Sequence, residues 1–287
     1  MISAWLVSIL TIVSWYVWYT PDRRRRDRFF GITRRQRNLH ILCSFLRIGS
    51  GGASGTERLR VGFTGPAIIR SEYLGAHLLR VTLENAPRRS RVANVLNRFR
   101  PLTIDIDAAS QALEATRGGE GTLVLMGSRV YNSLTRKYFD DNDRSFFQWV
   151  RSANGERTLQ PRRGQDQNLP VRRAPLADED PSSVRSTQLA VLERLWDSEH
   201  ERYVFLLVGV GALATTGAAK YLAENWRMLD RKIRKGRLGR EFAILLNFAE
   251  CLADLTLEED ISDIPKPTVL CITDRTTYTV PVGGILT

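Results

Sequence analysis

The sequence predicts an α/β protein in which an N-terminal single transmembrane helix precedes a Rossmann-like domain with a largely parallel sheet. Two observations lead to this prediction. Residues 2–19 form an apolar stretch without a charged residue, and short apolar stretches alternate with amphipathic ones further along the chain. Strands that alternate with helices favour a parallel sheet with right-handed crossovers. We therefore expect a transmembrane helix at 1–20, a basic juxtamembrane segment at 21–38 and one α/β domain over 39–287.

The N-terminal stretch fits a single crossing of a bilayer. About 18 residues at roughly 1.5 Å each span nearly the whole hydrocarbon layer. A secretory signal peptide would need a basic start and a small-residue cleavage site, so a buried core helix is the remaining alternative. Arginines after a span mark its cytoplasmic side, which predicts a single-pass protein of the cell membrane with a cytoplasmic C-terminal domain. The expected membrane-interface residues are Trp15, Trp18, Arg23, Arg24, Arg25 and Arg26.

The formal net charge of +11 is concentrated next to this stretch. Residues 22–37 contain eight arginines and two aspartates, a net charge of +6. Topology and attraction to anionic lipids, about 1 kcal/mol per basic residue near the surface, account for this cluster. A second basic run at 227–240 is followed by an acidic stretch at 250–263 and is interpreted as a solvated face. Nucleic acid is therefore not an expected partner, whereas the membrane is.

Cysteine and histidine are sparse. The cysteines are odd in number and lie in apolar stretches, which indicates reduced, buried thiols rather than disulfides. The histidines have no partner at metal-ligand spacing, so we expect no metal site and no cofactor. These residues are Cys43, Cys251, Cys271, His40, His77 and His200.

The alternating pattern predicts the elements of the domain. Strands are expected at 39–48, 102–106, 122–126, 203–208, 242–246 and 269–272. Helices are expected at 66–84, 108–116, 130–139 and 213–226. Residues 152–187 contain four prolines and few apolar side chains, which predicts a flexible insertion. A hairpin turn at Asn154 and Gly155 is expected near its start.

The turn after the expected strand 203–208 is the strongest indication of a ligand site. It carries Gly209 and Gly211 in the pattern G-x-G-x-x-G/A between a strand and a helix, with Thr215 and Thr216 following. Such a turn lets a phosphate approach the backbone at a helix N-terminus. Asn247 stands where a dinucleotide site would have an acidic residue, so a smaller nucleotide or nucleoside fits better. The alternative is that the glycines only permit close packing of the helix on the sheet.

A second turn has the same architecture. The expected strand 122–126 ends in Gly127 and Ser128, and Asn132 follows on the next helix. Ligands of open α/β sheets bind at the carboxyl ends of strands, so the two turns are expected to share one crevice. The alternative is that Ser128 simply caps a helix.

The other candidates are less specific. A glycine-rich stretch at 49–55 lacks the Lys of a phosphate loop and is interpreted as a connector, while Glu72 is a candidate polar contact at the crevice. Asp105 and Asp107 are the acid/base candidates, although Asp107 is also a candidate helix cap before residue 108. No complete catalytic motif is present, so catalytic residues remain unassigned.

These motifs resemble a known group of domains. The run 124–128 with Asn132, and the later run 215–219 after a glycine turn, are similar to Rossmann-like nucleotide-sensing domains of the nucleoside deoxyribosyltransferase-like and SLOG groups. Some of these occur in membrane-tethered bacterial defence proteins. The resemblance covers roughly residues 39–275 and implies a sensor of a nucleotide-like ligand.

The sequence therefore predicts a membrane-anchored cytoplasmic sensor or effector that binds a nucleotide-like small molecule in bacterial antiviral signalling. A nucleotide or nucleoside hydrolase or glycosidase is the first alternative, and a membrane-associated scaffold without a small ligand is the second. A further copy of the chain is a candidate partner.

Overall fold

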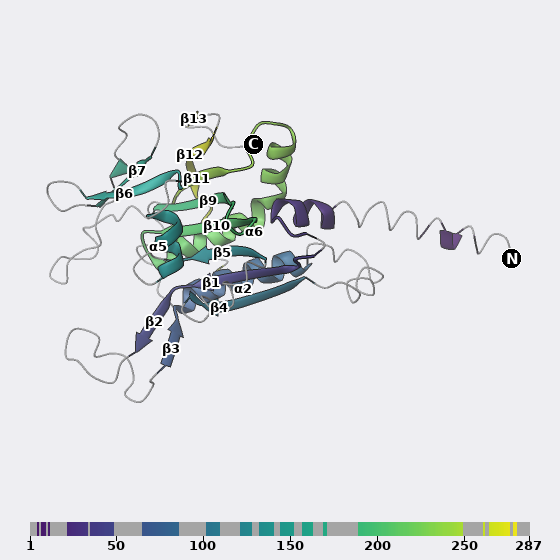
Figure 1. Cartoon of the computed structure of the whole chain (residues 1–287), viewed down its shortest axis with the longest axis horizontal. Helices are drawn as coiled ribbons and strands as arrows, with labels where there is room; N and C mark the ends of the chain where they lie inside the picture. The colour runs from purple at the N-terminus through teal and green to yellow at the C-terminus, as the bar shows by residue number, and fades with distance from the viewer. Residues whose placement is uncertain are drawn as a thin grey trace.

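The computed structural model describes about three fifths of the chain. The described positions are 5, 7–9, 11, 22–33, 35–48, 65–85, 102–109, 121–127, 132–140, 144–151, 157–162, 169–170, 189–248, 261, 264–275 and 278–279. Within these residues the protein is a mixed α/β structure built on one large sheet (Figure 1).

The large sheet has eight strands in the order β13-β12-β11-β9-β10-β5-β1-β4. Its strands are β1 (Asn38–Cys43), β4 (Thr103–Ala108), β5 (Thr122–Met126), β9 (Leu189–Asp197), β10 (Arg202–Gly209), β11 (Phe242–Asn247), β12 (Thr268–Asp274) and β13 (Tyr278–Thr279). The four neighbours β4, β1, β5 and β10 are parallel. The remaining strands join through antiparallel pairs, beginning with the β9–β10 hairpin.

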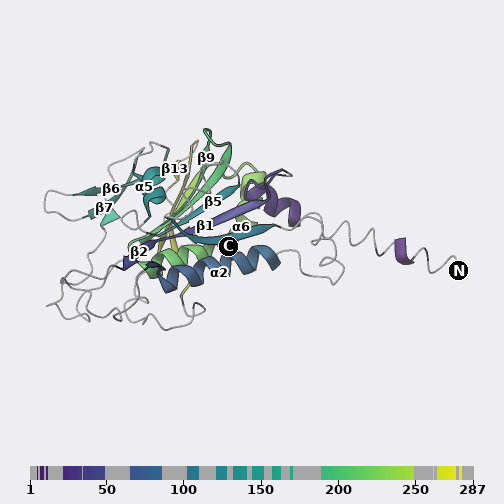
Figure 2. The same cartoon turned by 60° about the horizontal axis from the view of Figure 1, so that its bottom comes forward.

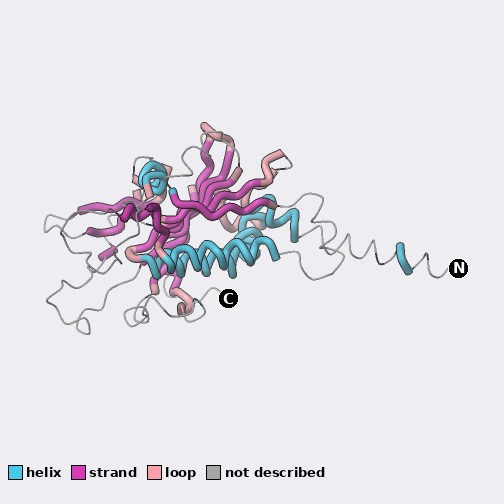
Figure 3. Tube along the Cα trace, turned by 90° about the horizontal axis from the view of Figure 1, so that it is seen from below, coloured by secondary structure: helices cyan, strands magenta, loops and turns pink. Residues whose placement is uncertain are grey.

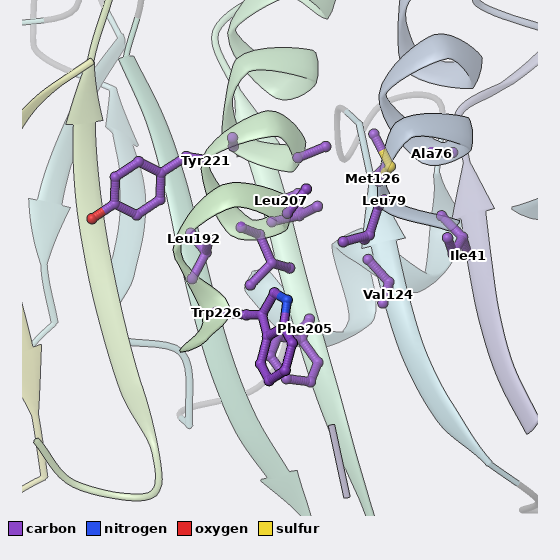
Figure 4. Close-up of a cluster of buried hydrophobic side chains, with 14 of the residues drawn as sticks. Ile41, Ala76, Leu79, Val124, Met126, Leu192, Phe205, Leu207, Tyr221 and Trp226 are labelled. Carbon is purple, nitrogen blue, oxygen red and sulfur yellow. The ribbon is translucent and has the colours of Figure 1, made fainter. Parts of the chain in front are cut away.

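Two long helices cover one face of this sheet. Helix α2 (Arg70–Asn85) connects β1 to β4, and helix α6 (Ala212–Arg234) connects β10 to β11. They lie side by side beneath the sheet (Figure 2). Their apolar side chains and one face of the strands form a continuous core in which Trp226 packs near Phe205 (Figure 4).

The opposite face of the sheet is also buried. Helix α5 (Ser133–Phe139) and a small antiparallel sheet cover it, as the view in Figure 3 shows from below. The strands of the small sheet are β6 (Phe147–Arg151), β7 (Arg157–Pro161) and β8 (Leu169–Pro170), and a separate ribbon pairs β2 (Phe45–Ile48) with β3 (Gly65–Ile68). Because the central strands are covered on both sides, their side chains are apolar without alternation, as in β10.

The folded domain begins earlier in the chain than the sequence predicts. Residues 22–29 form a short helix, which we call the arginine helix, and its Phe29 is buried in the core beneath the sheet. The Arg26 guanidinium donates a hydrogen bond of 2.8 Å to the carbonyl of Leu83 in α2. The Arg194 guanidinium donates one of 3.0 Å to the carbonyl of Phe29. The expected juxtamembrane segment thus contributes the arginine helix, which packs against α2 and the sheet.

The structure changes the predicted elements in several places. The first long helix, expected from residue 66, begins at Arg70, because residues 65–68 form β3. The sheet is parallel in only four of its eight strands, because β9 was not expected and pairs antiparallel with both β10 and β11. The expected insertion 152–187 contributes β7 and β8, and β7 pairs antiparallel with β6, whereas the expected turn residues Asn154 and Gly155 lie outside the described residues. Residue 108 ends β4, and most of the helix expected at 108–116 lies outside the described residues.

The expected membrane span falls largely outside the described part of the chain. Of residues 2–19, only positions 5, 7–9 and 11 are described, and Trp15 and Trp18 are not among them. No helix within the described residues combines the length and the apolar character that crossing a membrane requires.

Candidate functional site

The two glycine turns lie next to each other at one edge of the sheet. Strands β5 and β10 are parallel neighbours that stay in register as far as the pair Met126 and Leu207. The next residue of β5, Gly127, donates its N–H to the Leu207 carbonyl at 3.1 Å. Strand β1 ends on the other side of β5, at Cys43. The structure therefore brings the carboxyl ends of β1, β5 and β10 together, as the sequence predicts; we call this the β1–β5–β10 edge.

Gly127 occupies a position that no other residue fits. Its φ of +103° lies in the left-handed region that side chains avoid. A Cβ atom there would lie 1.9 Å from the Ser44 hydroxyl and 2.8 Å from both carboxylate oxygens of Glu72. The glycine thus allows the β5 backbone to cross directly over a buried carboxyl group.

Glu72 is the main ionisable group at this edge. It lies in the first turn of α2, is 2% exposed and accepts a hydrogen bond of 2.8 Å from the Ser44 N–H. Burial raises the pKa of Glu72, and the Ser44 N–H and hydroxyl oppose that rise. The adjacent Ser71 hydroxyl is buried without a hydrogen-bond partner. Buried polar groups of this kind are unusual and mark candidate functional sites.

The Asn132 side chain, at the start of α5, holds the β1–β5–β10 edge together by hydrogen bonds. Its side-chain amide donates to the carbonyls of Leu42 at 3.2 Å and Met126 at 3.1 Å. Its side-chain oxygen accepts from the N–H groups of Leu134 at 3.1 Å and Thr135 at 3.0 Å, which caps the helix. All its hydrogen-bonding capacity is used within the fold, so Asn132 positions the β1 and β5 ends and is not itself free to bind a ligand. Ser128 lies outside the described residues.

The first glycine of the other turn serves packing. The Thr215 hydroxyl accepts from the Gly209 N–H and donates to the Gly211 carbonyl, both at 3.1 Å. A Cβ on Gly209 would lie 2.4 Å from the Thr215 backbone nitrogen, and one on Gly217 would lie 2.5 Å from the Phe248 ring. The packing interpretation therefore holds for Gly209 and Gly217, and the predicted ligand contact Thr215 closes the turn instead.

Gly211 is different from these glycines because it is exposed. It precedes α6 as the N-cap, with φ of −143° and no side-chain capping bond. The first N–H groups of a helix have no partner within the helix and carry partial positive charge. Thr216, the remaining predicted contact, is buried, and its methyl group lies opposite Gly75 of α2. Of the four contacts predicted in this turn, Gly211 is the exposed one, next to the exposed Val210.

The predicted acid/base candidates take other positions. Asp105 lies beside His40 of the neighbouring strand, with 3.6 Å between its carboxylate oxygen and the ring nitrogen. Asp107 is within β4, so it does not cap a helix at residue 108. It lies close enough to Cys43 to contribute, after burial and Glu72, to the raised pKa of that thiol. Asp107 therefore adds a second carboxylate, besides Glu72, close to the β1–β5–β10 edge.

A second polar cluster lies at the far end of the sheet, in the β9–β10 turn. Asp197, Glu199 and His200 offer three ligand atoms within 4.8 Å of one another. Asp197 already accepts a hydrogen bond from the Tyr138 hydroxyl at 2.5 Å and contacts the His200 ring nitrogen at 2.8 Å. The buried Arg202 guanidinium lies 3.5 Å from the same carboxylate. A cation would compete with these partners, so we interpret the cluster as a structural network.

The predicted membrane-interface arginines lie on the arginine helix and differ in exposure. Arg24 is exposed, whereas Arg23 and Arg25 pair with aspartates of the same helix at 3.9 and 3.6 Å. Arg26 is 2% exposed, and burial lowers its pKa. Arg26 thus faces the domain, where it ties the arginine helix to α2.

Comparison of the chain with family models, with curated proteins and with solved structures found no match. The class of the protein therefore follows from its own geometry: a mixed α/β domain with glycine turns, helix N-termini and a buried carboxyl group at one sheet edge.

Proposed function

We propose that the protein is a membrane-anchored cytoplasmic sensor or effector that binds a nucleotide-like ligand at the β1–β5–β10 edge. The observation that carries the proposal is the adjacency of the turns at Gly127 and Gly211, at the carboxyl ends of parallel strands. This is the place where open α/β sheets bind their ligands. A role in bacterial antiviral signalling rests on the resemblance to defence-associated sensor domains.

The chemistry of the edge suits a ligand with two unlike ends. At the α6 end, the exposed Gly211 and the helix N-terminus favour a phosphate. At the β1 end, Glu72 and the unpartnered Ser71 hydroxyl favour groups that donate and accept hydrogen bonds, such as ribose hydroxyls. A nucleotide carries both kinds of group, whereas a bare phosphate would not use Glu72.

The same helices that begin at this edge end beside the arginine helix. Helix α6 has 23 residues, which corresponds to about 35 Å. At its far end Asp230 pairs with Arg28 at 2.9 Å, and at the far end of α2 the Leu83 carbonyl accepts from Arg26 at 2.8 Å. A ligand that shifts either helix would therefore change contacts next to the expected membrane anchor, which supports a sensor.

The proposal is tested by ligand binding to the full chain in nanodiscs. Phe29 and Phe30 belong to the core, so removal of residues 1–37 would damage the fold. We expect at least one nucleotide or cyclic nucleotide from a panel to raise the melting temperature. Gly211→Val should abolish that shift without lowering the melting temperature of the ligand-free protein, because φ at this exposed position suits any residue. No shift with any nucleotide would refute the proposal.

A hydrolase or glycosidase acting on a nucleotide or nucleoside is a second candidate. Burial raises the pKa of Glu72, as is common for carboxyl groups that act as acids or bases. Product chromatography after incubation with the same panel distinguishes the two functions. Turnover that is lost in Glu72→Gln would establish the enzyme, and binding without turnover would establish the sensor.

A further inference from the structure

Two basic stretches that are about 200 positions apart in the sequence lie side by side. Arg227 pairs with Asp22 at 3.4 Å, and Arg28 pairs with Asp230 at 2.9 Å. These contacts join the arginine helix to the C-terminal part of α6, and Figure 1 shows the two helices together at one end of the domain. We call the surface formed by residues 22–28 and 227–240 the basic face.

The basic face carries most of the net charge of the chain. Residues 22–28 and 227–240 contain 12 arginines and lysines, of which Arg26 is buried, and 3 aspartates, a net charge of +9 out of the total of +11. The aspartates pair with arginines. Asp230 is buried between Arg28 and Arg234, and Asp27 contacts Arg26 and also Arg37, which lies outside the face. The outward positive charge is left on exposed side chains, which are Arg24, Arg231, Lys235, Arg237 and Arg240.

The position of this face indicates its partner. In the sequence, the arginine helix begins three residues after the apolar stretch 2–19, so the basic face is close along the chain to the expected membrane anchor. The described apolar side chains of the stretch include Trp5 and Val7, which are 70% and 63% exposed. An apolar segment next to a dense positive surface matches the layered chemistry of a membrane with anionic headgroups.

We infer that the basic face binds anionic lipid headgroups, with the 227–240 stretch contributing as much as the arginine helix. The sequence alone presents 227–240 as a solvated face, and only the fold places it beside the first cluster. The inference rests on the membrane association in the proposed function and is independent of the ligand. It also orients the domain, because the β1–β5–β10 edge lies at the opposite ends of α2 and α6 and so points away from the lipid surface.

The test uses the full chain with Leu10→Arg, which disables insertion and isolates the contribution of the basic face. We expect this protein to cosediment with phosphatidylcholine vesicles that contain phosphatidylserine, and not with pure phosphatidylcholine vesicles. High salt should release it from the anionic vesicles. Adding Arg231→Gln, Lys235→Gln and Arg237→Gln should weaken binding roughly a hundredfold, since about 1 kcal/mol per basic residue is about fivefold each. The matched control removes three exposed charges elsewhere, with Arg136→Gln, Lys137→Gln and Lys266→Gln, and should bind unchanged.

The outcomes separate the inference from the proposed anchor. Equal binding to both kinds of vesicle, or unchanged binding of the first triple variant, would overturn the inference. Binding to a DNA duplex in place of the anionic vesicles, lost in the same variant, would overturn it too and assign the face to nucleic acid. A further outcome is that carbonate extracts the wild-type chain from membranes while the Leu10→Arg protein still binds anionic vesicles. That result would support lipid binding by the basic face and refute the transmembrane anchor. Equal melting temperatures of both triple variants confirm that each is folded.

Discussion

Glu193 makes the stability of the fold depend on pH near neutrality. The side chain is fully buried in the middle of β9, on the face covered by α5 and β6. Its carboxylate accepts hydrogen bonds from the Ser145 hydroxyl at 3.0 Å and from the N–H groups of Phe146 and Phe147 at 3.1 Å. Burial nevertheless raises the pKa of Glu193 to about 7. The proton is thus held more tightly in the folded protein than in the unfolded chain.

The sign and size of the effect follow from this difference. The native state binds more protons between the unfolded pKa of about 4.5 and the folded pKa of about 7, so the free energy of unfolding falls as the pH rises through this window. A difference of about 2.5 pKa units at 1.36 kcal/mol each corresponds to roughly 3 kcal/mol. Glu193→Gln removes the titration and keeps the shape. Its amide can donate to the Ser145 oxygen, and the Ser145 hydroxyl hydrogen can then turn to the Phe147 carbonyl, which lies 2.8 Å away.

The assay is urea unfolding of the wild type and Glu193→Gln at pH 5 and pH 8. The two proteins should have similar stability at pH 5, and at pH 8 the variant should be more stable by up to about 3 kcal/mol. Subtracting the two pH profiles cancels the contribution of Glu72 and other titrating groups. Parallel profiles, or a variant less stable than the wild type at pH 8, would refute the assigned role of burial at Glu193.

Three further substitutions, the first with a control variant, test the geometry of the fold. Gly127→Ala should lower the free energy of unfolding by at least about 2 kcal/mol, because its Cβ clashes with Ser44. The control Gly236→Ala, also at positive φ but in open space, should lower it by only about 1 kcal/mol. Equal losses of stability would contradict the clash. Asn132→Ala should cost about 3 kcal/mol through its lost cap and unsatisfied carbonyls, and a loss under 1 kcal/mol would contradict the network. Phe29→Ala should cost about 3–5 kcal/mol, while an unchanged urea midpoint would show that the arginine helix is not part of the core.

The parts of the fold that the sequence predicts are those specified by local pattern. Strand β5 matches its predicted bounds because a continuous apolar run between a glycine and a Gly-Ser turn suits a strand covered on both faces. The glycine turns also lie together as expected, since adjacent parallel strands must end at the same edge. Helix α6 extends to Arg234, eight residues further than predicted, because its basic last turns are paired or solvated.

The missed features depend on partners that are distant in sequence. Strand β9 contains the charged residues Glu193 and Arg194 in succession, a pattern that predicts an exposed segment rather than a buried strand. Both side chains are buried. Residues 145–147 cover Glu193, and Arg194 lies between Phe29 and Tyr203. The centre of the Tyr203 ring is 3.6 Å from the guanidinium carbon of Arg194. The partners that compensate the burial of these charges are distant in sequence, so the pattern of neighbouring residues does not predict them.

The candidate site shows the same division. Asn132 and Thr215 were predicted as ligand contacts from their spacing, yet their hydrogen bonds are spent on backbone groups of the turns. Glu72 lies 28 positions from its partner Ser44, and the sequence offered only its place near the start of a helix. Spacing therefore predicted that the two turns lie side by side, whereas the exposure and hydrogen bonds of each side chain become visible only in the fold.

Ligand binding at the β1–β5–β10 edge is tested most directly by titration calorimetry of the full chain with the nucleotide that stabilises it most. The dissociation constant is compared between the wild type and Gly211→Val, with Gly236→Ala as a control in the turn after α6. We predict that Gly211→Val weakens binding at least about tenfold, or about 1.4 kcal/mol, while the control binds like the wild type. Equal affinity of Gly211→Val and the wild type would contradict the assignment of this edge as the binding site.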